Sequence, residues 1–209
     1  MLLLDGPLTF REFMTHEDVP LASLFREVFL FLAGRTDLAL FGAQAVNAYC
    51  EPERMTQDVD LLSTDASGLA EALRAHLATH FHLALRIREP ALGIGFRVYQ
   101  LRQPKNRHLV DIRYVPELPD TNEIHGVAVV TPPELIAMKI ISLAQRRGRP
   151  KGGTDLVDVQ RLLLTFPTLK HAEGLVAAKL QRLGASDTAR ALWVDVAHAP
   201  LEDDEDEGY

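Results

Sequence analysis

The sequence has little cysteine and no long apolar run. Cys50 is the single cysteine among 209 residues, so no disulfide can form within the chain and nothing points to an oxidising compartment. No apolar stretch approaches the roughly 20 residues that a bilayer-spanning helix needs. The apolar start, residues 1–4, is followed at once by Asp5-Gly6-Pro7 and lacks the features of a signal peptide. We therefore expect a cytoplasmic protein without a membrane partner.

An excess of basic residues is also missing. The formal net charge of −7 argues against a protein that coats nucleic acid generally, although residues 146–151 form a local basic run. The histidines do not recur at metal-binding spacing. Cys50 has no patterned histidine partner, so we expect a buried structural thiol rather than a nucleophile. With 47% hydrophobic residues, the chain can form one substantial core, alone or with a small appended domain.

Hydrophobic periodicity predicts an α/β part followed by an all-helical part. Short apolar or alternating runs predict strands at 38–41, 55–63, 81–88, 94–101, 108–115 and 124–130. Helical spacing predicts helices at 19–33, 43–49, 66–80, 131–147, 154–165, 168–183 and 186–198. Thr131-Pro132-Pro133-Glu134 has the pattern of a capping box, and Thr154 is a second predicted cap. We expect an α/β domain at residues 1–130, a helical domain at 131–200 and an acidic disordered tail at 201–209.

Two carboxylates stand two residues apart in the apolar run 55–63. In a strand, Asp58 and Asp60 would project to the same face, about 6.6 Å apart along the strand. Hard cations such as Mg²⁺ prefer carboxylate oxygens together with water and substrate phosphate. Upstream, Gly42 separates a predicted strand from a predicted helix, a unit that favours phosphate binding. The alternative is that alternation merely exposes both acids on a solvated face of the sheet.

A third carboxylate, Asp111, lies in the apolar run Leu109-Val110-Asp111-Ile112. A lone acid in such a strand is costly unless it faces a metal, a cation or water. Phosphoryl and nucleotidyl transfer commonly use carboxylates that hold metal and a further group that orients the attacking hydroxyl. We interpret Asp111 as that third acid. The alternative is an edge-strand residue that faces solvent or pairs with Arg113.

These motifs resemble the polymerase-β-like nucleotidyltransferase superfamily, in which a small-residue turn precedes D-x-D and a third acid. The form Thr56-Gln57-Asp58-Val59-Asp60, and the helix around Lys139 that leads to Asp155 and Asp158, are similar to AbiEii-type toxin nucleotidyltransferases. The resemblance covers residues 38–164. It implies an α/β (α+β) fold, with a nucleotidyltransferase-like mixed β-sheet, flanking helices and a C-terminal helical bundle.

The resemblance also implies roles for individual residues. Asp58, Asp60 and Asp111 would be catalytic and would bind Mg²⁺ or Mn²⁺. Gly42 would line the triphosphate, with Ala43 in the place of the family's second Gly or Ser. The other expected nucleotide-binding residues are Thr56, Lys139, Asp155 and Asp158, the last two on an acidic turn. The alternative for Lys139 is a surface lysine on an amphipathic helix.

The resulting hypothesis is Mg²⁺-dependent transfer of a nucleoside monophosphate from an NTP to an acceptor hydroxyl. In the toxin-like relatives the acceptor is expected to be RNA, such as a tRNA 3′ end, or a protein, and an antitoxin would be a partner. One alternative is nucleotidylation of a small molecule such as an antibiotic. Another is a catalytically weak nucleotide-binding or interaction protein with the same fold.

Overall fold

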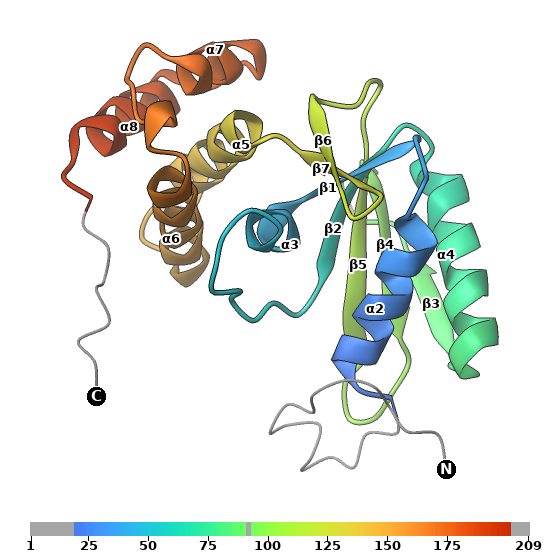
Figure 1. The fold of residues 1–209 in the computed structure, drawn as a ribbon. Coiled ribbons are helices and arrows are strands. Elements are labelled where there is room, and N and C mark those ends of the chain that lie inside the picture. The colour runs from blue at the N-terminus through green and yellow to red at the C-terminus, as the bar shows by residue number, and fades with distance from the viewer. Residues whose placement is uncertain (1–18, 91–92, 202–209) are drawn as a thin grey trace. The chain divides into compact units, whose positions relative to one another are not determined.

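The fold is described by a computed structural model for residues 19–90 and 93–201 (Figure 1). Apart from Leu201, the predicted acidic tail lies outside the described residues. The strands are β1 (Leu38–Phe41), β2 (Val59–Ser63), β3 (Leu85–Arg88), β4 (Gly95–Gln100), β5 (Arg107–Tyr114), β6 (Thr121–Ile124) and β7 (Val127–Val130). The helices are α2 (Leu21–Leu32), α3 (Gly42–Asn47), α4 (Ala66–Phe81), α5 (Pro132–Gln145), α6 (Pro150–Thr165), the 3₁₀ turn η1 (Pro167–Leu169), α7 (Leu175–Arg182) and α8 (Asp187–His198).

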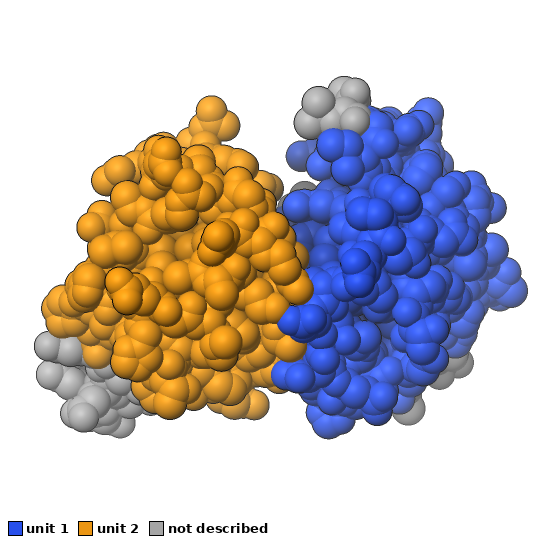
Figure 2. All heavy atoms as spheres, turned by 90° about the horizontal axis from the view of Figure 1, so that it is seen from above, with its two compact units in different colours: residues 1–44, 55–129 blue, residues 45–54, 130–209 orange. Residues whose placement is uncertain are grey.

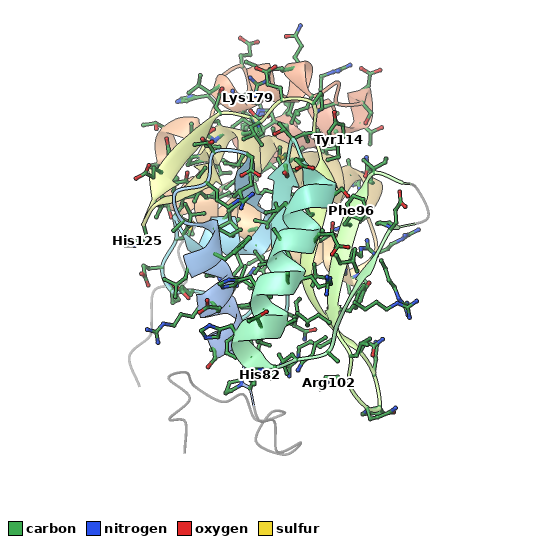
Figure 3. All side chains as sticks on the ribbon, turned by 90° about the vertical axis from the view of Figure 1, so that its right-hand side faces the viewer. His82, Phe96, Arg102, Tyr114, His125 and Lys179 are labelled. Carbon is green, nitrogen blue, oxygen red and sulfur yellow. The ribbon has the colours of Figure 1, made fainter. Side chains whose placement is uncertain are left out.

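A seven-stranded mixed sheet forms the α/β part, in the order β3-β4-β5-β2-β1-β7-β6. Strands β2 and β5 are parallel, as are β1 and β7, whereas β1–β2, β3–β4 and β4–β5 are antiparallel. Helix α4 packs on β2, β3, β4 and β5 and also contacts α2. Figure 3 looks onto the face of the sheet that these two helices cover. This arrangement confirms the predicted α/β class with a mixed sheet.

Apolar spacing explains how α2 and α4 attach to this core. The buried residues of α2 recur every three or four positions, and α4 buries one stripe of the same kind; they are Leu24, Phe25, Val28 and Leu32 in α2, and Leu69, Ala70, Leu73 and Leu77 in α4. Asp65 caps α4 by accepting a hydrogen bond from the Gly68 N–H. These stripes therefore attach α4 to one face of the sheet and α2 to α4.

Several predicted boundaries are wrong. Helix α4 continues to Phe81 and ends where His82 (labelled in Figure 3) has a φ of 54°, so β3 begins only at Leu85. The strand predicted at 124–130 is a hairpin instead, because His125 and Gly126 have positive φ and reverse the chain between β6 and β7.

Two predicted helices also differ from the observed ones. The helix predicted at 168–183 is divided into η1 and α7, with non-helical residues between them. Helix α6 starts at Pro150, so Thr154 is not its cap; the Thr154 hydroxyl lies inside the helix and donates to the carbonyl oxygen of Lys151. Proline at the first helical position explains the earlier start, since its missing N–H costs nothing there.

The chain forms two compact units, coloured separately in Figure 2. One contains residues up to Gln44 together with Met55–Val129; the other contains Ala45–Arg54 together with the residues from Val130 onward. In the second unit, which we call the helical unit, α5 packs against α6, α7 and α8. None of the helices among the described residues is long and apolar enough to cross a membrane.

The predicted capping box at the start of α5 does not form. Thr131 occupies the N-cap position, but its side chain makes no capping hydrogen bond and its buried hydroxyl has no hydrogen-bond partner among the described residues. The fully buried Glu134 carboxylate instead contacts Arg182 at 2.7 Å and Lys179 at 3.1 Å. A buried carboxylate gains more from two cations than from one backbone N–H, so the ion pair prevails over the local cap.

Candidate functional site

Asp60 and Asp111 lie directly opposite one another on the parallel strands β2 and β5. The same row continues to Arg97 on β4 and to Phe41 on β1. Residues paired across a sheet share a face, so all four side chains lie on the same side. The local sequence explains this placement, because the apolar neighbours Leu61, Val110 and Ile112 are fully buried and fix the register of both strands.

Gly42 brings the backbone against this acidic pair. It follows β1 directly, has a φ of 71°, and begins α3. A Cβ atom at this position would lie 2.1 Å from Oδ2 of Asp60, which is closer than the Cβ atom of a real side chain approaches another atom. Both the left-handed backbone and the close approach therefore require glycine. Ala43, the next residue, is buried.

Asp111 is buried and contacts two arginines. Its Oδ2 accepts a hydrogen bond of 2.9 Å from Nε of Arg97, and its Oδ1 lies 3.8 Å from Nε of Arg113. Burial alone would lower the pKa of Arg97, but the hydrogen bond and the charge of Asp111 outweigh it, and the pKa of Arg97 lies above its ordinary value. Arg97 thus stays charged beside Asp111. Because β5 lies between β4 and β2, Asp111 is not an edge-strand residue.

Asp58 lies just before β2, not inside it, because the strand begins at Val59. The preceding turn is held by the Thr56 hydroxyl, which donates to the carbonyl oxygen of Asp58 at 3.2 Å. Oδ2 of Asp58 lies 3.2 Å from Nδ1 of His108. A register shift between Val98 and Tyr99 makes His108 the partner of Tyr99, with ring centroids 5.0 Å apart. The shift therefore brings His108 to the side of the sheet that carries Asp58.

Lys139, Asp155 and Asp158 meet in the helical unit. Nζ of Lys139 contacts Oδ1 of Asp155 at 3.1 Å and Oδ2 of Asp158 at 2.6 Å. Both acids lie within helix α6 and are buried, so they do not form the predicted acidic turn. The Lys139 side chain is only 13% exposed, which contradicts the alternative of a surface lysine. Oδ2 of Asp155 accepts hydrogen bonds from the Ser142 hydroxyl at 2.8 Å and from Nη1 of Arg146 at 3.5 Å.

The segment Ala45–Arg54 is attached to α6 by the same network. Arg54 donates to both carboxylate oxygens of Asp158, at 2.6 and 2.8 Å. Arg161 donates to Oδ1 of Asn47 at 3.1 Å and to the carbonyl oxygen of Cys50 at 3.1 Å. Cys50 is buried, as predicted, and burial raises the pKa of its thiol despite a hydrogen bond from Thr165 and the charge of Arg161. The thiol is therefore a structural group and not an activated nucleophile.

The acids of this site have the type of ligand atom that a divalent cation prefers. Carboxylates on neighbouring strands, next to a glycine that admits close backbone approach, are the oxygen donors that Mg²⁺ and Mn²⁺ prefer. Within residues 19–90 and 93–201, however, no three His, Cys, Asp or Glu side chains converge as a metal-binding cluster. Asp111 faces Arg97 and Asp58 faces His108. A cation would replace these contacts as it bound.

Arg97 and His108 are the residues that sequence reasoning missed. Alternation in the run 94–101 shows that Arg97 shares a face with Tyr99, but their partners on β5 depend on the strand register. The register shift that turns His108 toward Asp58 left no signal in composition or periodicity. The side chains around the acids could therefore be placed only with the structure.

Comparison with known proteins supports the fold. No protein-family model and no curated protein sequence matches the chain. Among solved structures, JHP933 from Helicobacter pylori is similar, with a TM-score of 0.58 and 18% identity over 93% of this chain and 84% of that one. An H. pylori structure described as a candidate nucleotidyltransferase has a TM-score of 0.58 and 17% identity, over 93% of this chain and 86% of that one.

The Megavirus polyadenylate synthase is also similar, with a TM-score of 0.57 and 15% identity over 69% of this chain. The match covers 31% of the synthase, so this chain spans about a third of that protein. Identities this low show the fold alone. The chain thus has a nucleotidyltransferase-like fold, and its activity has to be argued from the site.

Proposed function

We propose that this chain transfers a nucleoside monophosphate from an NTP to an acceptor hydroxyl and releases pyrophosphate. The observation that carries the proposal is the pairing of Asp60 with Asp111 across β2 and β5, with the backbone of Gly42 against Asp60. Carboxylates beside a glycine turn can serve a phosphate and its counter-ion at once. The nucleotidyltransferase-like fold supports the same reaction by analogy.

In this reaction the protein mainly positions the substrates and neutralises the charge on the transferred phosphate. Asp58, Asp60 and Asp111 would hold Mg²⁺ or Mn²⁺, which neutralises the charge that develops on the transferred phosphate. Gly42 and Ala43 would present backbone N–H groups to the triphosphate, and Thr56 would keep Asp58 in place. Asp111 would accept a hydrogen bond from the acceptor hydroxyl and orient it. No covalent enzyme intermediate is needed.

For Lys139, Asp155 and Asp158 we propose a positioning role. Their mutual contacts within the helical unit support a positioning role, in which two carboxylates fix the side chain of Lys139. Binding of a nucleotide phosphate by Lys139 stays a prediction, since its ammonium group already has two anionic partners.

A second candidate function is nucleotide binding without efficient transfer. The observation that favours it is the contact between Arg97 and Asp111, which satisfies the third acid without a cation. The methyl group of Ala43, at the position where the family has Gly or Ser, also favours inefficient transfer.

The resemblance to AbiEii-type toxins extends the proposal to a biological role. In that role the acceptor is RNA or a protein, and a partner antitoxin neutralises the activity. Induced expression in a bacterial host should then arrest growth, and the Asp58→Asn, Asp60→Asn double variant should not. Equal growth with both chains would contradict the toxin role and leave the transferase chemistry to be judged separately.

Label transfer tests the reaction itself. The protein is incubated with each labelled NTP and Mg²⁺, and with total RNA, protein or small hydroxylated acceptors such as aminoglycosides. We expect transfer to one acceptor class, and loss of at least about a hundredfold in the Asp58→Asn, Asp60→Asn variant. Glu71→Gln with Asp187→Asn is a matched control, because both acids are exposed. Transfer that survives in the Asp58, Asp60 variant would overturn the proposed site. Nucleotide binding without transfer to any acceptor would favour the second candidate.

A further inference from the structure

The sheet face that carries Asp60 and Asp111 also carries arginines on β3 and β4. Arg88 is the register partner of Arg97, which is the partner of Asp111. Arg86 is likewise the partner of Tyr99, two residues beyond Arg97 on β4. Alternation places Ile87 and the fully buried Val98 on the opposite face, which α4 covers. We call the group of Arg86, Arg88, Arg97 and Tyr99 the arginine face.

The positive charges of this face are accessible. Arg86 and Arg88 are exposed, and the Arg97 side chain is 43% exposed. Neither Arg86 nor Arg88 forms an ion pair with an acid among the described residues, whereas Arg97 pairs with Asp111 and also has a side-chain hydrogen bond with Tyr99. The guanidinium carbon of Arg88 lies 5.6 Å from the centroid of the Tyr99 ring. The face thus combines two guanidinium groups that contact no carboxylate of the described residues with an aromatic ring, on which one of them lies.

The strand order places this face on one side of the acids and the glycine turn on the other. From β3 the order runs through β4, β5 and β2 to β1, so Arg86 and Arg88 approach the acidic pair across β4, and Gly42 approaches it from β1. In an in-line displacement the attacking and leaving oxygens stand on opposite sides of the transferred phosphate. If the triphosphate lies against Gly42, the acceptor enters from the arginine face.

The chemistry of the face selects among acceptors. Arginine binds phosphate groups, and an aromatic ring between arginines offers a platform on which a base can stack. The same charges repel a polycationic acceptor such as an aminoglycoside. They are local, so they agree with a chain whose net charge is −7 and which does not coat nucleic acid generally.

We infer that the arginine face binds a single-stranded nucleic acid and directs its terminal hydroxyl toward Asp111. This inference rests on the proposed function for its catalytic consequence, but the binding surface does not depend on it. Arg86 and Arg88 contact backbone phosphates, and Tyr99 stacks on a base. Arg97, already held by Asp111, contributes charge at the end nearest the acids.

Binding is tested on the whole chain, with a fluorescent single-stranded RNA 12-mer followed by anisotropy in EDTA, without nucleotide. We expect Arg86→Gln with Arg88→Gln to weaken binding about tenfold, and to reduce the slope of log affinity against log salt by about 1.4, or about 0.7 for each phosphate that an arginine no longer neutralises. Arg26→Gln with Arg74→Gln removes the same charge from α2 and α4 and should change neither quantity. Arg86→Lys with Arg88→Lys should keep most of the salt slope. Tyr99→Ala should weaken binding, and Tyr99→Phe should not.

The outcomes separate this inference from the proposed function. Loss of binding in the Arg86, Arg88 variant supports the surface even if no acceptor is ever labelled. Conversely, transfer to RNA with unchanged binding and salt slope in that variant would overturn the surface and leave the reaction standing. Labelling of a protein acceptor that is equal in the wild type and the variant would overturn the role of the arginine face in directing the acceptor toward Asp111. Thermal unfolding of every variant shows whether a loss reflects misfolding; Arg86 and Arg88 are exposed, so their variants should keep the wild-type transition.

Discussion

Nζ of Lys139 lies 2.6 Å from Oδ2 of Asp158, a carboxylate that is fully buried in the helical unit. The same carboxylate accepts hydrogen bonds from Nε and Nη2 of Arg54, so one acid joins helix α5 to the segment Ala45–Arg54. Lys139 therefore fixes the interior of its own unit, whatever it adds to nucleotide binding.

Replacing Asp158 by alanine should destabilise the protein strongly. The change leaves the cations of Lys139 and Arg54 without their shared anion in a buried place, which costs about 3–5 kcal/mol. Urea unfolding followed by circular dichroism measures the loss. Glu173→Ala, at an exposed acid with no ion pair to a described residue, is the control and should change the free energy of unfolding by less than about 0.5 kcal/mol. A loss below about 1 kcal/mol for Asp158→Ala would contradict the network.

Stability should depend on pH through Asp158. Burial alone would raise the pKa of Asp158, but the hydrogen bonds from Arg54 and the charge of Lys139 outweigh it and hold the pKa below its ordinary value. A lowered folded pKa gives stability that is present above the unfolded pKa of about 3.9 and is lost as pH falls through the folded value. The free energy of unfolding, measured from pH 6 down to pH 3, should therefore fall more steeply for the wild type than for Asp158→Asn below about pH 4. Parallel curves would show that the pKa is not lowered.

Gly42→Ala should damage both stability and the acidic pair. Its positive φ costs an alanine about 1–2 kcal/mol, and the added Cβ must displace the Asp60 carboxylate. Gly34→Ala is a matched control, since Gly34 has a φ of 74° and a Cβ there would meet nothing within 4 Å. We expect Gly42→Ala to lose more stability than Gly34→Ala and, unlike it, to lose the proposed transfer activity. Equal effects on both measurements would mean that the backbone conformation alone matters.

Substitutions at the start of α5 test whether the Thr131 side chain caps this helix. Thr131→Val removes a buried hydroxyl without a partner among the described residues and keeps the shape, so it should be neutral or slightly stabilising, whereas loss of a working cap costs about 1 kcal/mol. Glu134→Ala should cost about 3 kcal/mol, because it removes the fully buried anion that both Arg182 and Lys179 contact. Thermal unfolding of both variants gives the comparison. A destabilised Thr131→Val would indicate that the cap forms in solution.

Arg97→Gln should strengthen cation binding. Arg97 competes for Asp111, and its side chain is 43% exposed, so water screens its charge strongly; removing that charge should raise Mn²⁺ affinity roughly threefold to tenfold. Titration followed by the electron paramagnetic resonance of free Mn²⁺ measures this affinity. Arg74→Gln, on the helix-covered side, should leave it unchanged. Weaker binding in Arg97→Gln would mean that the arginine orients Asp111 for the cation and does not oppose it.

The sequence predicted the kind of residues at the site better than their contacts. Alternation and apolar context placed Asp58, Asp60 and Asp111 inside strands, which is confirmed for Asp60 and Asp111 but wrong for Asp58, since β2 begins at Val59. They could not show that Asp60 and Asp111 are register partners, because register is decided by packing between distant segments. Thr131 and Glu134 are the opposite case. Their local pattern predicts a capping box, but the buried Glu134 carboxylate pairs with Arg182 instead.

The segment Ala45–Arg54 has a consequence for dissection of the protein. The chain leaves the α/β unit after Gln44, returns at Met55 and leaves again at Val130, so neither unit is one continuous stretch. A fragment that ends at residue 129 would keep Arg54 but lose Asp158, and one that begins at 130 would keep Asp158 but lose Arg54. The two parts therefore cannot be exchanged between proteins as simple cassettes. A recombinant helical unit would need residues 45–54 joined to it through a new linker or a permuted chain order.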